Sequence, residues 1–174
     1  MSIYRDQLWY DNSTDTLNVN AKLTTTATIT QPNYKVVSTV SATQSIPSGT
    51  ATAVAFTTDT RTNWPVRSDN TRFVAPVAGT YAVAVQCGYG TPPGTAGSNR
   101  MLVLLNGTTL LGEQSFPFGT AINIFRVDCI VTMNGTTDYI VVQLVQASGG
   151  SVSAGGTNPD GGNYNNITID RIHA

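Results

Sequence analysis

The stretch Arg72–Val85, with the sequence RFVAPVAGTYAVAV, combines a short apolar run, a break at Pro76 and Gly79, and a longer alternating run that starts at Tyr81. Pro76 has no backbone N–H to donate to a sheet, and Gly79 accepts backbone conformations that other residues avoid. The break therefore predicts that one strand ends before Pro76 and that a second strand enters the other sheet. Tyr81 and the alternating valines then bury one face of that strand.

The rest of the 174-residue chain indicates an all-β protein. Charged residues make up 11% of it, against roughly 25% in a typical globular chain, and glutamate occurs once, as Glu113. Apolar runs of strand length recur between clusters of Gly, Pro, Asn and Ser, which is typical of a sandwich or jelly roll. Two pairs, Asn106-Gly107 and Asn134-Gly135, predict tight hairpin turns with positive φ.

The charge pattern argues against a nucleic-acid or membrane partner. The formal net charge is −1, the pI is about 5.6, and the nine Lys and Arg residues are scattered, so the attraction that phosphate backbones require is missing. No apolar run approaches the roughly 20 residues that span a bilayer. The beginning of the chain, MSIYRDQLWYDN, has neither a basic flank nor an apolar segment, so we expect no export signal.

The two cysteines, Cys87 and Cys129, each stand alone in an apolar run of strand length, AVAVQCGYG and FRVDCIVTM. Counting alternate positions along each run places both thiols on the face that points to the core. Two interpretations remain, a pair of small buried side chains with free thiols or a single disulfide. The absence of a visible export signal favours free thiols.

The sequence does not predict an enzyme, a metal site or a cofactor. The single histidine, His173, is the penultimate residue, and any Ser-His-Asp or Cys-His arrangement would have to use it. The cysteines are isolated rather than paired as CxxC. The segment NPDGGN offers oxygen ligands from Asn158 and Asp160, but one carboxylate is too few for a strong calcium site, and a turn is the favoured interpretation.

The spacing of Phe73, Pro76, Gly79 and Tyr81 resembles that of the globular head of the complement C1q and tumour-necrosis-factor-like superfamily. The runs LVLLNG, VTMNGTTDYIVVQL and NITIDRI resemble later strands of the same family, so the resemblance covers about residues 35–174. It implies an all-β, ten-stranded antiparallel jelly-roll sandwich that forms a homotrimer. The residues assigned to the fold motif and core are Phe73, Pro76, Gly79, Tyr81, Cys87, Cys129 and Tyr139, and the candidates for the three-fold axis are Tyr81, Tyr139 and Tyr164.

Residues 1–33 differ in composition from the jelly-roll domain predicted for residues 34–174. Aromatic and charged residues cluster in IYRDQLWYDN, and a threonine-rich alternating segment follows and ends at Pro32. A short segment with little core of its own becomes ordered by packing on something else. We therefore predict an extended N-terminal anchoring arm, whose segment DNSTDTLNVNAKLTTTATIT resembles short repeats at the starts of bacteriophage fibre proteins. The anchoring side chains are expected to be Tyr4, Leu8, Trp9 and Tyr10.

Two functions fit these features. The first is a bacteriophage capsid decoration or head-fibre protein, a trimeric knob whose residues 1–33 hold it on the major capsid protein or another virion protein. We then expect it at the virion surface after assembly in the host cytoplasm. The alternative is a tail-fibre or receptor-binding tip whose loops recognise a host-surface glycan or protein. The residues proposed for that recognition are Tyr89, Asn158, Asp160 and Tyr164. A secreted soluble ligand ranks last, because neither a signal peptide nor a collagen-like stalk is visible.

Overall fold

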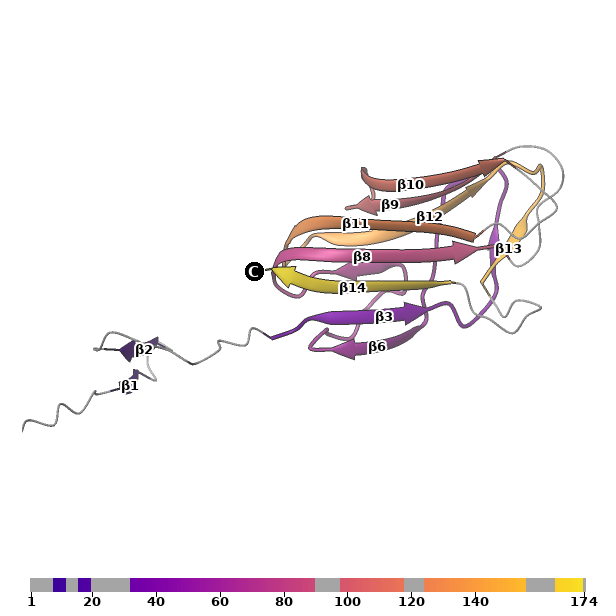
Figure 1. The fold of residues 1–174 in the computed structure, drawn as a ribbon. Coiled ribbons are helices and arrows are strands. Elements are labelled where there is room, and N and C mark those ends of the chain that lie inside the picture. The colour runs from indigo at the N-terminus through magenta and orange to yellow at the C-terminus, as the bar shows by residue number, and fades with distance from the viewer. Residues whose placement is uncertain are drawn as a thin grey trace, which may run out of the picture. The chain divides into compact units, whose positions relative to one another are not determined.

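The computed structural model describes residues 8–11, 16–19, 32–89, 98–117, 124–155 and 165–173. The chain divides into two compact units, residues 1–31 and residues 32–174. Every regular element assigned in the described residues is a β-strand (Figure 1), which confirms the all-β prediction. In the first unit, β1 (Leu8–Asp11) pairs antiparallel with β2 (Thr16–Val19). The second unit contains β3 (Lys35–Thr39), β4 (Gln44–Ile46), β5 (Thr52–Ala53), β6 (Thr58–Thr62), β7 (Arg72–Val74), β8 (Ala78–Gly88), β9 (Ser98–Leu105), β10 (Thr109–Pro117), β11 (Ile124–Asn134), β12 (Tyr139–Gln146), β13 (Val152–Ala154) and β14 (Asn166–His173).

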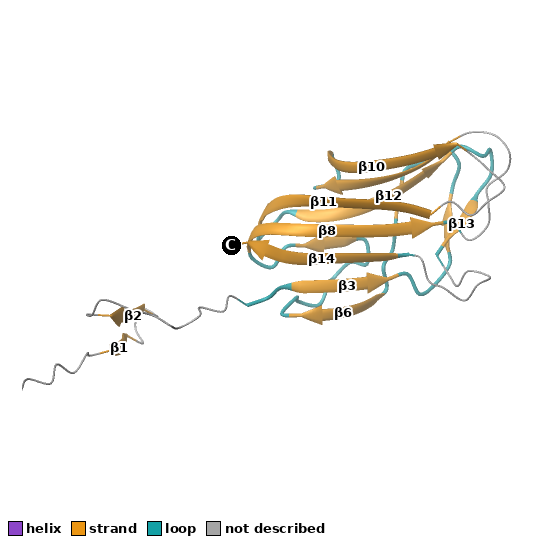
Figure 2. Cartoon of the chain, viewed as in Figure 1, coloured by secondary structure: helices purple, strands orange, loops and turns teal. Residues whose placement is uncertain are grey.

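The strands of the second unit form two five-stranded antiparallel sheets. One has the order β11-β8-β14-β3-β6, and in the other β10, β9 and β12 lie side by side while β5 and β7 both pair with β12. Strands β4 and β13 pair with each other in a separate two-stranded ribbon. Figure 2 shows that loops and turns connect these strands throughout the described part. The resemblance implied ten strands. The described residues of the second unit form two sheets of five strands each, and the ribbon adds two further strands.

The chain changes sheets at Pro76. Strand β7 pairs with β12, where Phe73 lies opposite Ile140, whereas β8 pairs with β11 and β14 in the other sheet. The prediction that the Pro76 and Gly79 break carries the chain into the other sheet is therefore confirmed. Gly79 has a φ of 156°, and a Cβ atom there would lie 2.5 Å from the backbone oxygen of His173. A glycine is thus required where the start of β8 passes close to the end of β14.

The core lies on the face of each strand that the sequence alternation predicts. On β8 the side chains of Val83, Val85 and Cys87 are buried, and on β11 Phe125 and Val127 are buried in the same way. Aromatic rings reinforce the packing, because Phe56 meets Phe73 edge to face with 5.6 Å between ring centroids and Trp64 meets Tyr81 in the same way at 5.8 Å. The period of two therefore determines which residues enter the core.

Both cysteines carry free thiols. Cys87 is buried and Cys129 is half-buried against the core, and burial raises the pKa of each thiol above its ordinary value. Cys87 lies opposite Phe125 and Cys129 lies opposite Val83, so the register of β8 and β11 places the two cysteines in different cross-strand rows. The interpretation of two small buried side chains agrees with this arrangement.

The two Asn-Gly pairs make different turns. Asn106 and Gly107 have φ angles of 55° and 73° between β9 and β10, which confirms the predicted tight turn. At the second pair only Gly135 has a positive φ, 74°. The predicted hairpin is wrong there, because β11 and β12 belong to different sheets and do not pair with each other. The Oδ1 atom of Asn134 instead accepts backbone N–H donors across the turn, including that of Asp138 at 3.1 Å.

Three short strands depart from the sequence prediction. The run TAVAF forms a strand only at Thr52–Ala53, and β6, with the sequence TDTRT, has no apolar residue that would reveal it. The glycine-rich stretch that follows β12 contains β13, although no apolar run of strand length marks it in the sequence. β13 forms because it pairs with β4, which lies about a hundred residues earlier in the chain, and no local pattern announces such a partner.

Candidate interaction surfaces

The outward face of the β11-β8-β14-β3-β6 sheet faces the viewer in Figure 1, and no described segment lies in front of it. We call this surface the open face. Because side chains alternate along a strand, the residues between the buried positions of β8 point outward here, including Ala82 and Ala84. The register aligns two rows across all five strands, which are Ile130, Ala82, Asp170, Lys35 and Thr62, and Asp128, Ala84, Thr168, Val37 and Thr60.

The open face is nearly neutral. Small side chains lie at its centre on β8, and its most exposed large apolar side chain, Ile130, is 68% exposed. Its charges compensate one another within the chain, since Lys35 Nζ lies 3.7 Å from Asp170 Oδ2 and Arg126 Nε lies 2.9 Å from Asp128 Oδ2. A surface with an exposed isoleucine and paired charges is suited to contact with another protein.

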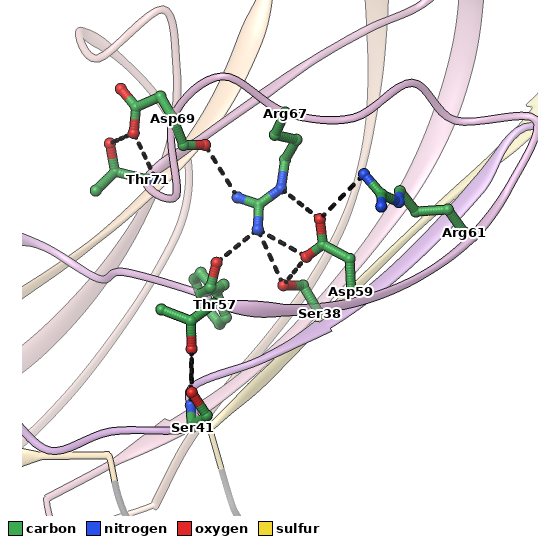
Figure 3. Close-up of polar contacts among 9 residues, drawn as sticks. Ser38, Ser41, Thr57, Asp59, Arg61, Arg67, Asp69 and Thr71 are labelled. Carbon is green, nitrogen blue, oxygen red and sulfur yellow. Dashed lines mark hydrogen bonds and ion pairs between the residues drawn. The ribbon is translucent and has the colours of Figure 1, made fainter.

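A buried guanidinium occupies the edge of the sandwich between β6 and β7 (Figure 3). The Arg67 side chain is 5% exposed, and its Nε and Nη2 atoms donate to the two carboxylate oxygens of Asp59 at 3.1 and 2.7 Å. Nη2 also donates to the backbone oxygen of Phe56 at 2.5 Å, and the guanidinium lies 4.1 Å from the centre of the Phe73 ring. Arg67 lies in the segment between β6 and β7. It connects this segment to β6 through Asp59 and to β7 through the Phe73 ring.

Asp59 remains ionised in this setting. Burial alone would raise the pKa of its carboxyl group, but hydrogen bonds from Arg67 and from Ser38 Oγ at 2.5 Å, together with the nearby arginine charges, outweigh it. The pKa of Asp59 is therefore held below its ordinary value. Arg67 was not among the residues that the sequence singled out, and its role follows only from the approach of β6, β3 and β7.

The predicted motif residues lie mostly in the core. Phe73 and Tyr81 are fully buried, and the Tyr81 hydroxyl donates to the backbone oxygen of Val77 at 2.6 Å. Tyr81 is therefore a core residue of a single chain and is not available to line a three-fold axis. Pro76 is half-buried beside the change of sheet. Tyr139 is half-buried, with the Arg72 guanidinium 5.3 Å from the centre of its ring.

The predicted recognition residues are not assembled into a site by the described structure. Tyr89 was expected to be exposed, but it is 1% exposed, and its hydroxyl donates to the backbone oxygen of Val145 at 3.2 Å. This expectation is wrong because Tyr89, which directly follows β8, is still part of the core and packs edge to face on Phe125. The remaining recognition residues, Asn158, Asp160 and Tyr164, lie outside the described residues.

The predicted anchoring residues belong to the first unit. Leu8, Trp9 and Tyr10 are part of β1, and they lie opposite Val19, Asn18 and Leu17 of β2. Tyr4 lies outside the described residues. The arm is thus seen as a short antiparallel hairpin where it is described.

The described residues offer little that suggests catalysis. They contain no group of three or more His, Cys, Asp or Glu side chains that could bind a metal ion together. The single histidine, His173, lies exposed at the end of β14. No helix that could serve as a membrane span is found in the ranges that the structure describes.

No protein-family model and no curated protein matches the chain. Solved structures do match it. Eiger TNF from S. frugiperda is 10% identical, with 82% of this chain and 94% of that chain covered and a TM-score of 0.59. Murine APRIL at pH 8.0 is 13% identical, with 80% of this chain and 99% of that chain covered and a TM-score of 0.59. Identities this low carry information about the fold alone, and the fold of residues 32–174 is a jelly roll of the tumour-necrosis-factor-like type.

Proposed function

We propose that this protein is a non-enzymatic structural protein of a bacteriophage virion, a homotrimeric jelly-roll knob held on the capsid surface through residues 1–33. The observation that carries the proposal is the open face, a nearly neutral sheet surface that no described segment covers. The resemblance of the Phe73 to Tyr81 spacing to a trimeric superfamily supports the same assembly. The proposed site is the virion surface, reached after assembly in the host cytoplasm.

The open face supports self-association on physical grounds. Ala82 and Ala84 let a second copy approach the sheet closely, while Ile130, 68% exposed, offers apolar area that association would remove from water. The ion pairs of Arg126 with Asp128 and of Lys35 with Asp170 leave few uncompensated charges to desolvate. Three copies related by a cyclic axis would use one heterologous interface three times.

The arm supports attachment to another protein. An isolated two-stranded hairpin is at best marginally stable in water, so the pairing of β1 with β2 calls for a partner surface. The sequence of β1, LWYD, contains two aromatic residues, a residue type that is enriched where proteins contact one another. Three arms on one trimer would multiply weak individual contacts through their effective concentration, which gives firm attachment without a strong single site. The proposed partner is the major capsid protein or another virion protein.

The substitution Ala84→Arg tests the assembly. A long charged side chain at the centre of the open face is expected to prevent close approach, so the variant should be monomeric while the unchanged protein is trimeric. Sedimentation equilibrium measures the mass of each. The matched control is Gln143→Arg on β12 of the other sheet, which should remain trimeric. A monomeric unchanged protein, or a trimeric Ala84→Arg variant, would argue against the open face as the interface.

Deleting residues 1–33 tests the attachment. Particles that carry the complete protein are expected to show knobs on the capsid, and particles assembled with the shortened protein should lack them. Electron microscopy of both particles is the measurement, and circular dichroism of the shortened protein checks that the jelly roll still forms. Knob density confined to the tail tip, or binding of the purified protein to host cells, would instead support the receptor-binding alternative.

A further inference from the structure

We propose that a cavity at the edge of the sandwich binds an apolar side chain of a protein partner, with an acidic residue next to that side chain in the partner sequence. The cavity has a volume of about 240 Å³ and lies between the segment from Trp64 to Asp69 and strand β7. We call it the edge cavity. Its residues are not on the open face, so a substitution at the centre of that face leaves the lining of the cavity unchanged.

The size of the edge cavity suits a single side chain. Pockets for drug-sized molecules measure roughly 300–1,000 Å³, whereas a cavity of roughly 150 Å³ holds a benzene ring. At about 240 Å³ the edge cavity falls between these values. It therefore matches one large aliphatic or aromatic side chain better than a complete cofactor or an oligosaccharide.

Half of the residues that line the edge cavity are apolar and half are polar or charged, and the apolar half includes exposed side chains. Val66 is 79% exposed and Val74 is 41% exposed, and they are two of the few large apolar side chains that the described residues present to solvent. Pro65 and Trp64 complete this lining. Trp64 is 5% exposed and its ring packs edge to face on Tyr81, so its faces are committed to the core. A sugar, which binds by stacking on an exposed ring face, would find no such platform here.

The rim of the edge cavity carries one arginine with unused donors. The Arg72 side chain is 56% exposed, and its Nε lies 3.2 Å from Asp69 Oδ2, while its two terminal nitrogens make no hydrogen bond or ion pair with other described residues. Arg67, the other cation at the cavity, is also paired with an aspartate, but its Nε, Nη1 and Nη2 atoms all donate hydrogen bonds within the chain, whereas Arg72 is paired through Nε. Arg72 is thus the group on this rim that can receive a carboxylate from a partner.

Asp69, the carboxylate at the rim of the edge cavity, already accepts hydrogen bonds within the chain and is not free to bind a cationic side chain of a partner. Both the hydroxyl and the backbone N–H of Thr71 donate to Asp69 Oδ1 at 2.6 Å, and Arg72 faces the other oxygen. The hydrogen bonds from the Thr71 side chain and backbone, helped by the nearby arginines, outweigh partial burial and lower the pKa of Asp69. Asp69 therefore stays ionised and engaged, and it positions the Arg72 guanidinium beside the apolar walls. The geometry combines an apolar recess with an adjacent cation.

A peptide titration tests this inference on the full-length protein. The probe is a tetrapeptide amide with the sequence glycine, isoleucine, glutamate, glycine, and the comparison peptide has lysine in place of glutamate. The protein is labelled with fluorotryptophan, so that ¹⁹F resonances report on Trp64 at the cavity and on Trp9 in the arm, which are the two tryptophans of the chain. We expect the Trp64 resonance to shift saturably with a dissociation constant of about 1 mM while the Trp9 resonance stays fixed.

Variants separate the edge cavity from general surface binding. Arg72→Gln is expected to weaken binding about three- to fivefold, since it removes the charge and the guanidinium donors but keeps a polar side chain. Val66→Glu, an exposed position, is expected to abolish the shift by placing a like charge at the mouth. The matched control is Arg126→Gln, because Arg126 is also an exposed arginine paired with an aspartate but lies on the open face. This variant should leave the dissociation constant unchanged within about twofold.

The same titration on the Ala84→Arg variant separates this inference from the proposed assembly, because binding at the edge cavity is expected to be the same in both proteins. Equal shifts with the lysine peptide, an unshifted Trp64 resonance, or an equal loss of affinity in Arg126→Gln and Arg72→Gln would each overturn the inference.

Discussion

Replacing Arg67 with alanine is expected to lower the free energy of unfolding by about 3–5 kcal/mol, the range found when one member of a buried ion pair is removed. Arg67 makes five hydrogen bonds, and the Asp59 carboxylate it pairs with is 11% exposed. Without the guanidinium, Asp59 is left charged in a largely dry environment, with only Ser38 and the more distant Arg61 beside it. The aromatic face of Phe73 also loses its cation.

Urea denaturation of the unchanged and variant proteins measures this difference. The matched control is Arg126→Ala, because Arg126 also pairs with an aspartate, but its side chain is 70% exposed. That variant should differ from the unchanged protein by no more than about 0.5 kcal/mol. The double variant Arg67→Met with Asp59→Leu should lose much less stability than Arg67→Ala, because neither charge is then left without a partner. Similar losses for the buried and the exposed arginine would contradict this account.

The loss in free energy of unfolding caused by Arg67→Ala is also expected to depend on pH. The pKa of Asp59 is lower in the folded protein than in the unfolded chain, so the unfolded chain binds more protons as the solution is acidified. The stabilisation that Asp59 provides is therefore complete above its unfolded pKa of about 3.9 and is lost as the pH falls through the folded value. Denaturation series at neutral and acidic pH should show the gap between the unchanged protein and Arg67→Ala narrowing with acid.

Gly135→Ala is expected to destabilise the protein by about 2–5 kcal/mol. Gly135 has a φ of 74°, a conformation that costs other residues roughly 1–2 kcal/mol. A Cβ atom at this position would also overlap the backbone of Val77 and Ala78, where the chain changes sheets. Backbone cannot rotate away as a side-chain tip can, so relieving the overlap would displace the start of β8 or the turn itself, at a further cost of roughly 1–3 kcal/mol.

A second glycine separates the two contributions. Gly149 has a similar φ of 86°, but a Cβ atom there would have no atom within 4 Å. Gly149→Ala is therefore expected to lose only about 1 kcal/mol, from the backbone conformation alone. Thermal or urea unfolding of both variants gives the comparison. If the two substitutions destabilise the protein equally, the close approach of the β11 to β12 turn and the β7 to β8 connection is not the reason for the glycine at position 135.

The sequence by itself determined the local features of this fold. The Pro76 and Gly79 break predicts the change of sheet because a missing donor and a permissive backbone are properties of the residues themselves. The alternation after Tyr81 places Val83, Val85 and Cys87 in the core because successive side chains of a strand point to opposite faces. The same alternation also places Ala82 and Ala84 on the outward side of β8. The sheet order was needed to show that they lie at the centre of the open face.

The tertiary structure alone decided the features that depend on distant partners. Arg67 becomes a buried ion-pair partner because β6, β3 and β7 meet around it, and the edge cavity exists because the segment after β6 folds back toward β7. Tyr89 is buried because Phe125 and the backbone of Val145 surround it, although its neighbours in the sequence are glycines. Strands β4 and β13 form through pairing across about a hundred residues. Backbone preference and side-chain alternation act within a few residues, whereas burial and ion pairing are set by whichever elements the sheet topology brings together.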